Sequence, residues 1–133
     1  AERALPEHYL ARYALADLFL DTFPFNAGTT ANDALWMGLP VLTLSGRSFA
    51  ARMAGALLTA AGLPELITYD LQDYEDKAVE LATTPGACLR LREHLEAERA
   101  SGVLFDTPRF VRNLERELAN LVVAPPLLSP DAA

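Results

Sequence analysis

A chain of 133 residues that is 51% hydrophobic and 22% charged has the size and composition of one globular domain, and it differs from the apolar-poor composition of a disordered segment. Its formal net charge of −7 argues against a nucleic-acid partner, because affinity for phosphate backbones comes mainly from clustered Lys and Arg, and Lys77 is the only lysine. The single cysteine, Cys88, excludes an internal disulfide and makes a cytoplasmic setting the default, while no apolar run is long enough to predict a membrane partner.

The first predicted elements are a helix and a short strand. Residues 6–16 carry apolar side chains at helical spacing and begin with a proline, which fits the first turn of a helix. The run DLFLDT, residues 17–22, then predicts a short buried strand.

The run DTFPFNAGTTANDALWMGLP, residues 21–40, joins this strand to a short helix. Thr30 is predicted to be the N-cap residue, with Asp33 at the third helical position as in a capping box. Gly38 stands just past the predicted end of the helix, and Pro40 would prevent its continuation.

Two further strand–helix units and a helical C-terminal part are predicted. In chain order they are a strand at 40–44, a helix capped by Ser48 and ending at Gly62, a strand at 65–69, a helix from the Asp70 cap to about residue 84, a charged helix to about residue 100, and a helix opened by Thr107 and Pro108. The last helix has an apolar stripe formed by Phe110, Leu114, Leu118 and Leu121. Residues 124–133 are interpreted as a tail, which leaves 1–123 as the domain.

This alternation of strands and helices predicts an α/β fold with a Rossmann-like parallel sheet, flanking helices and right-handed crossovers. About three strands are expected in the chain. A parallel sheet is normally covered by other elements on both faces, and its edge strands are normally protected from further pairing. We therefore interpret the three strands as part of a larger sheet. The chain also begins at Ala1 without an initiator methionine, which suggests a piece of a longer polypeptide.

The junction at residues 21–40 is the candidate binding site. Ligands of open parallel sheets lie beyond the carboxyl ends of the strands, where a helix N-terminus presents N–H groups to an anion. Gly28 would allow a close backbone approach, and Thr29 and Thr30 would add hydroxyl donors, so a phosphorylated ligand is predicted. A purely structural turn is the alternative from the residues alone, since neither G-x-G-x-x-G nor a Walker loop is present.

The run LDTFPFNAGTTANDALWMGLPVLTLSGRSFAARMAGALLTAAGLPELI, with DYEDKAVELA and LFDTPRFVRNLER, resembles the donor-binding lobe of O-GlcNAc transferases and their bacterial and SPINDLY-like relatives. That family has a D-T-x-x-x-N-x-x-T-T-x-x-D-x-L-W-x-G-x-P run, followed by G-x-x-x-A-S/A-R and L-x-x-x-G-L-x-E-L. The resemblance is specific and covers nearly the whole chain apart from the tail. It identifies the chain as similar to a bacterial-type member.

The resemblance implies a GT-B glycosyltransferase with two facing Rossmann-like lobes and upstream tetratricopeptide repeats. Residues 1–123 would be the C-terminal part of the catalytic region, which holds the nucleotide sugar. Such enzymes move N-acetylglucosamine from UDP-GlcNAc to Ser or Thr hydroxyls of acceptor proteins with inversion, and they use no metal or other cofactor. In keeping with this, the sequence lacks a D-x-D pair.

The resemblance also implies roles for individual residues. It places the diphosphate at Thr29 and Thr30 and the ribose at Asp33, where the capping and binding interpretations compete. Many relatives have a histidine directly before the Thr-Thr pair, where this chain has Gly28. At the position of Pro6 the animal enzymes carry a lysine that reaches the nucleotide.

The base is assigned to the first helix. Arg12 matches an arginine beside the uracil, although a solvated helix face is the alternative from the residues alone, and Ala4 matches a residue whose backbone meets the base edge. Tyr9 lies three residues before Arg12 on the same helical face, so its ring is expected to stack on the base.

No residue is predicted to be catalytic or to bind a metal, and Trp36 is expected to lie in the core. Family members place the lysine that stabilises the leaving diphosphate, and a histidine near the acceptor, upstream of the matching region. The chain by itself is therefore expected to be inactive. Two alternatives are a non-catalytic nucleotide-binding or helical interaction module and a relative that uses a GDP-sugar such as GDP-fucose.

Overall fold

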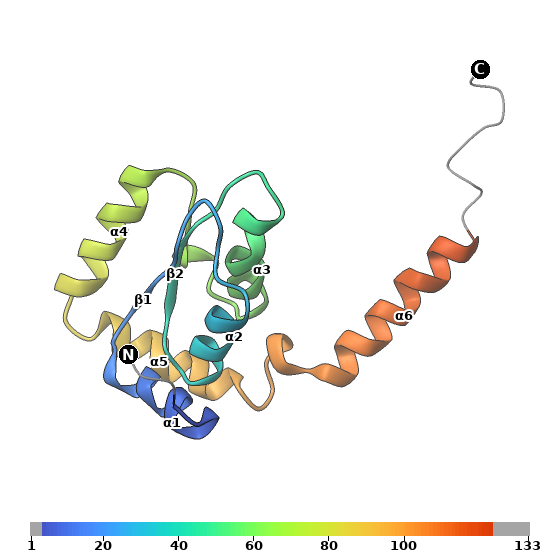
Figure 1. Ribbon diagram of the computed structural model, residues 1–133, viewed down its shortest axis with the longest axis horizontal. Helices are drawn as coiled ribbons and strands as arrows, with labels where there is room; N and C mark the ends of the chain where they lie inside the picture. The colour runs from blue at the N-terminus through green and yellow to red at the C-terminus, as the bar shows by residue number, and fades with distance from the viewer. Residues whose placement is uncertain (1–3, 124–133) are drawn as a thin grey trace, which may run out of the picture.

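The structure is a computed structural model that describes residues 4–123; the predicted tail at 124–133 lies outside the described residues. Three strands and six α-helices are present in this part of the chain, connected by short 3-10 turns (Figure 1). In chain order they are α1 (Pro6–Ala11), β1 (Phe19–Leu20), α2 (Thr29–Trp36), β2 (Val41–Leu44), α3 (Met53–Ala60), β3 (Ile67–Thr68), α4 (Leu71–Thr83), α5 (Ala87–Glu98) and α6 (Thr107–Val123).

The sheet is parallel, with the strands in the order β1-β2-β3. Phe19 pairs with Val41 on one side of β2, and Thr43 pairs with Ile67 on the other. Both crossovers run in the same direction across the sheet, and α2 and α3 lie together on one side of it, with α4 on the other, as crossovers of one hand predict (Figure 1). The predicted α/β fold with about three parallel strands is confirmed.

Several elements are shorter than their sequence patterns predict. The predicted helix at 6–16 ends as α-helix at Ala11 and continues as a 3-10 turn, Arg12–Leu15, so that Leu15 is 88% exposed. The strand pattern at 65–69 begins instead with a 3-10 turn, Pro64–Leu66. The buried strand predicted at 17–22 is likewise reduced to β1, in which Leu20 is 55% exposed, so the apolar pattern predicted neither the length nor the burial of these elements.

Much of the core lies between the sheet and the α2–α3 layer, and Leu81 of α4 and Leu95 of α5 belong to the same buried cluster. Its fully buried side chains include Leu35 of α2, Val41 of β2 and Leu58 of α3. Alanines at positions 31, 34 and 54 lie among them, and their small side chains allow α2 and α3 to approach each other closely. This packing fixes the first turns of both helices at the same edge of the sheet.

The last helix, α6, extends away from the other elements (Figure 1). All of its side chains from Thr107 to Val122 are exposed, including the predicted apolar stripe. Trp36 was expected in the core but is 43% exposed; it packs edge-to-face on Phe105, with the Arg99 guanidinium 5.8 Å from its ring centre. The indole therefore lies on the side of the molecule from which α6 departs.

Candidate functional site

The N-terminus of α2 stands at the carboxyl edge of the sheet, as predicted, but the capping prediction was wrong. The helix begins at Thr29, with Gly28 in the N-cap position and no side-chain cap, so Thr30 is the second helical residue. Asp33 cannot complete a capping box there. The reason is that the Asp21 carboxylate holds the amide of Ala27, so the chain turns into the helix directly after it, at Gly28.

The first turn of α2 leaves backbone donors for a ligand. The amide of Asn32 is the first to bond back within the helix, to the Gly28 carbonyl oxygen at 3.0 Å. The N–H groups of Thr29 and Thr30 precede it, have no acceptor within the helix and belong to exposed residues, whereas the next residue, Ala31, is fully buried. Aligned N–H groups at a positive dipole end favour an anion such as a phosphate.

Because Thr30 is exposed and caps nothing, the predicted role of Thr30 in binding can be tested separately from folding. We expect Thr30→Ala to change the free energy of unfolding by no more than about 0.5 kcal/mol, the scale of helix propensities, instead of the roughly 1 kcal/mol of a lost cap. If its hydroxyl contacts the diphosphate, UDP affinity falls about tenfold. Calorimetry and urea unfolding measure both, with exposed Thr83→Ala as the matched control.

The loop before α2 is held by one buried carboxylate. Asp21 is 3% exposed; its Oδ1 accepts from the amides of Thr22 and Ala27, each at 2.8 Å, and its Oδ2 accepts from Thr43 Oγ1 at 2.7 Å. The Tyr74 hydroxyl donates to the Asp21 carbonyl oxygen, and burial, followed by the charge of Asp21, raises the pKa of Tyr74. The loop is therefore tied to β2 and to α4.

A second buried side chain completes this attachment. The Asn26 Nδ2 group donates to the carbonyl oxygens of Thr22 and Leu44, at 3.0 and 3.2 Å. On the next strand, Thr68 Oγ1 donates to the Thr43 carbonyl oxygen. These hydrogen bonds connect β3 to β2 through Thr68 and Thr43, and β2 to Asp21, which follows β1. Asp21 in turn binds the amide of Ala27, just before α2.

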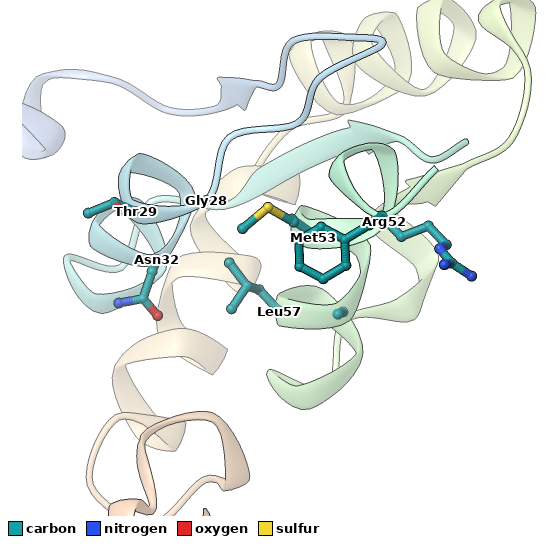
Figure 2. A pocket seen from close by; sticks show the side chains of 8 residues that line it. Gly28, Thr29, Asn32, Arg52, Met53 and Leu57 are labelled. Atoms are coloured by element: carbon teal, nitrogen blue, oxygen red, sulfur yellow. The ribbon is translucent and has the colours of Figure 1, made fainter. Parts of the chain in front are cut away.

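A pocket of about 580 Å³ opens between α2 and α3. Figure 2 shows Gly28, Thr29 and Asn32 on one side of it, with Met53 and Leu57 facing them. A Cβ atom at position 28 would lie only 2.7 Å from Met53 Cε, so the methionine methyl occupies the space that a side chain there would need. The remaining lining residues are Phe49, Arg52 and Ala56.

A pocket of about 350 Å³ lies between the first helical turns and β1. Tyr9, Arg12 and Tyr13 line it, and the two tyrosine rings meet edge-to-face with their centres 5.5 Å apart. The Tyr13 hydroxyl donates to the Thr30 carbonyl oxygen at 3.3 Å. Burial, then the hydrogen bond with Tyr9 and the charges of Tyr9 and Asp33, raise the pKa of Tyr13.

The structure therefore groups most of the predicted site residues around the first two turns of α2. Gly28 and Thr29 line the pocket on one side, and the pocket with Tyr9 and Arg12 is joined to Thr30 on the other. Asp33 is half-buried one turn further along α2. Ala4 is half-buried just before α1 and lines neither pocket.

Sequence reasoning missed three residues of this region. Tyr13 lies four residues after Tyr9, and that spacing on one helical face was a usable signal. Asn32 lies three residues after Thr29 and shares its face for the same reason. Met53 gave no local signal, because only the packing of α3 on α2 brings it to Gly28.

Within residues 4–123, no three His, Cys, Asp or Glu side chains gather closely enough to hold a metal ion. No helix in this part of the chain combines the length and apolar character needed to cross a membrane.

Comparison with known proteins places this geometry in a family. A family model described as glycosyl transferase family 41 matches residues 2–114. The chain is 43% identical over 114 residues to the probable UDP-N-acetylglucosamine–peptide N-acetylglucosaminyltransferase SEC of Arabidopsis thaliana, covering 85% of the chain and 12% of that protein. It is 36% identical over 118 residues to the UDP-N-acetylglucosamine–peptide N-acetylglucosaminyltransferase of Caenorhabditis elegans, covering 89% and 10%.

A solved structure gives the same result. The chain superimposes on a mutant O-GlcNAc transferase from Thermobaculum terrenum with a TM-score of 0.79 and 37% identity, covering 90% of the chain and 23% of that structure. The chain thus spans only a small part of the proteins that it matches. The predicted resemblance is confirmed, and the chain belongs to glycosyl transferase family 41.

Proposed function

We propose that this chain is the donor-binding part of a glycosyltransferase that transfers N-acetylglucosamine from UDP-GlcNAc to Ser or Thr hydroxyls of proteins, with inversion. The observation that carries the proposal is the start of α2. N–H groups of its first turn lack acceptors within the helix, Gly28 and Thr29 line one pocket, and the Tyr13 hydroxyl connects the pocket of Tyr9 and Arg12 to the Thr30 carbonyl oxygen. A nucleotide sugar has the same order of parts, because a diphosphate joins a nucleoside to a sugar.

The diphosphate is assigned to the start of α2. The amides and hydroxyls of Thr29 and Thr30 would donate to its oxygens, and Gly28 leaves the backbone open to close approach. Asp33 lies one turn further along the same helix and is assigned to the ribose hydroxyls, for which a carboxylate is a suitable acceptor.

The uracil is assigned to the pocket between α1 and β1. The Tyr9 ring would stack on the base, Arg12 would lie beside it, and the backbone near Ala4 would meet its edge. In this arrangement the Tyr13 ring packs edge-to-face against the Tyr9 ring, and the Tyr13 hydroxyl donates to the Thr30 carbonyl oxygen, which connects the base pocket to α2.

Transfer itself is assigned to partners outside this chain. An inverting transferase must stabilise the departing diphosphate, and in a metal-independent enzyme a cationic side chain does this. Lys77 is unsuited to the task, because it lies on α4 with its Nζ 2.7 Å from Glu80 Oε2. We assign the cationic group for the leaving diphosphate and the acceptor site to an upstream lobe and tetratricopeptide repeats. A cytoplasmic location of the protein stays a prediction.

Calorimetric titration with UDP and with GDP tests the proposal directly. We expect UDP to bind with a Kd in the high micromolar to millimolar range and GDP to bind more weakly. Tighter binding of GDP would indicate a GDP-sugar transferase. Absence of binding to either nucleotide, in a chain shown to be folded, would indicate an interaction module without a donor site.

The position of the base can be tested at Tyr9. We expect Tyr9→Ala to weaken UDP binding about fivefold, because an aromatic contact contributes roughly 1 kcal/mol. Tyr9→Phe keeps the ring and loses only the hydroxyl contact with Tyr13, so it should bind nearly as well as the parent chain. Titration of both variants, with the exposed Tyr69→Ala as control, measures the effect. Equal UDP affinity in all three would place the base elsewhere.

A further inference from the structure

We infer that Tyr13 is a positioning residue, whose hydroxyl holds the segment that carries Tyr9 at a fixed distance from the first turn of α2. Tyr13 has this role only if Tyr9 contacts the base and Thr30 the diphosphate, so it rests on the proposed function. In that arrangement Tyr13 acts on binding through those two residues, and not through a hydrogen bond of its own to the donor. Its hydroxyl therefore matters for a ligand that carries both parts.

Two tyrosine hydroxyls connect α1 to α2. The Tyr9 and Tyr13 hydroxyls are hydrogen-bonded to each other, and the Tyr13 hydroxyl donates to the Thr30 carbonyl oxygen at 3.3 Å. A tyrosine hydroxyl has a single proton to donate. Because Tyr13 uses its proton on Thr30, the Tyr9 hydroxyl is the donor in the bond between the two tyrosines. The hydrogen bonds thus run from Tyr9 through Tyr13 to the first turn of α2.

Tyr13 also connects this segment to the hydrophobic core. Its half-buried ring packs against the core cluster, and the Tyr9 ring packs edge-to-face on it. Neither α1 nor the 3-10 turn Arg12–Leu15 contains a fully buried side chain. The position of the segment therefore depends on partly buried contacts, and Tyr13 supplies one of these to the core and another to α2.

The Tyr13 hydroxyl lies close to the residues assigned to the ribose and the diphosphate. Thr30 and Asp33 are three positions apart on α2 and share one helical face. Burial is the largest cause of the raised pKa of Tyr13, followed by the hydrogen bond and charge of Tyr9, and the Asp33 carboxylate adds to the rise. The same phenol is therefore near Tyr9 on one side and near Asp33 and the Thr30 carbonyl on the other.

This position allows Tyr13 to act on the simultaneous binding of two parts of a nucleotide. When one part is bound, the second contact becomes intramolecular, and its strength depends on whether the two sites stand at the separation that the ligand needs. Sites that are not held in place have to be ordered when the ligand binds, which lowers affinity. Because the Tyr13 hydroxyl is engaged by Tyr9 and Thr30, its removal takes no hydrogen bond from the ligand.

Three ligands test this role on the intact chain. Uridine carries the base and ribose, pyrophosphate carries the two phosphates, and UDP carries both parts. We expect Tyr13→Phe, which keeps the ring and loses only the hydroxyl, to bind UDP about fivefold more weakly, the scale of one hydrogen bond. Its affinities for uridine and for pyrophosphate should equal those of the parent chain. Titrations followed by backbone-amide NMR measure all three dissociation constants.

Tyr9→Phe is the matched control. It removes one hydroxyl from the same series of hydrogen bonds but leaves the bond between Tyr13 and Thr30 in place. It should keep nearly the UDP affinity of the parent chain, and adding it to Tyr13→Phe should cause no further loss. The amide signal of Ala31 gives a direct readout, because that N–H shares a peptide unit with the Thr30 carbonyl. Without ligand, the signal should move in Tyr13→Phe and stay in place in Tyr9→Phe.

The outcomes separate this role from the proposed function. If Tyr13→Phe binds UDP as tightly as the parent chain does, the hydroxyl does not position the two sites. If the affinity for uridine or for pyrophosphate falls as much as that for UDP, Tyr13 belongs to one site alone and the inference is wrong. If the parent chain binds no nucleotide, the proposed function itself fails.

Discussion

Replacing Asp21 with alanine is expected to lower the free energy of unfolding by about 3 kcal/mol or more and to abolish UDP binding. The carboxylate is 3% exposed and accepts three hydrogen bonds. Its loss leaves the amides of Thr22 and Ala27 and the hydroxyl of Thr43 without that acceptor, and an unsatisfied buried donor costs roughly 1 to 3 kcal/mol. Binding is lost as well, because the amide of Ala27 sets the point at which the chain turns into α2.

Two matched variants make this test specific. Asp21→Asn keeps an oxygen for the two amides, and the Thr43 hydroxyl can rotate to accept from the new NH₂ group, so a smaller loss is expected. Asp17→Ala removes an exposed carboxylate from the same segment and should change little. Urea unfolding followed by Trp36 fluorescence gives the free energies. An unchanged midpoint for Asp21→Ala would mean that water replaces the carboxylate and that the loop is not held as described.

The purified 133-residue chain is expected to transfer no detectable N-acetylglucosamine to a Ser- or Thr-containing acceptor peptide, even when it is saturated with UDP-GlcNAc. The first turn of α2 supplies N–H donors to a diphosphate, but the only lysine is paired with Glu80 on α4. Of the two histidines, His8 is exposed on α1 and His94 Nε2 lies 2.9 Å from the Ala61 carbonyl oxygen. Stabilisation of the leaving group and orientation of the acceptor are therefore both missing.

The matching experiment adds an upstream catalytic segment of a family 41 protein, fused to the N-terminus of the chain. We expect transfer to appear in the fusion and to be lost again in its Asp21→Ala variant, which cannot hold the donor. A radiolabelled sugar on the acceptor peptide provides the readout. Robust transfer by the chain alone would contradict both the assignment of roles and the division between donor-binding and catalytic parts.

The sequence predicted the architecture because local signals agreed with one another. The Asp70 cap was correct, with its Oδ1 accepting from the Asp73 amide at 2.9 Å, and Gly38 ends α2 in the left-handed conformation with a φ of +78°. The parallel direction of the strands followed from the alternation of strands and helices, whereas the order β1-β2-β3 was not predicted. These features depend on neighbouring residues, and neighbouring residues are what a sequence pattern records.

The site was less predictable because it depends on contacts between distant segments. Thr30 has the right residue type for an N-cap, yet Ala27 bonds to Asp21 and the N-cap position falls on Gly28, two residues earlier. Met53 reaches Gly28 from 25 residues away along the chain, and its position follows from the packing of two alanine-rich helices. Trp36 was expected in the core. The buried face of α2 is formed by Ala31, Ala34 and Leu35, and Trp36 lies outside that face.

The position of α6 means that this chain contains two kinds of helix. Helices α2 and α3 are stabilised by the core, whereas the 17 residues of α6 expose all of their described side chains and depend mainly on bonds within the helix itself. A helix of that length without packing is only marginally formed in water and melts gradually from its ends. The circular dichroism signal contains contributions from both kinds of helix. The ellipticity is therefore expected to change gradually with temperature before the core unfolds. The indole at Trp36, lodged against Phe105, reports the cooperative transition of the core.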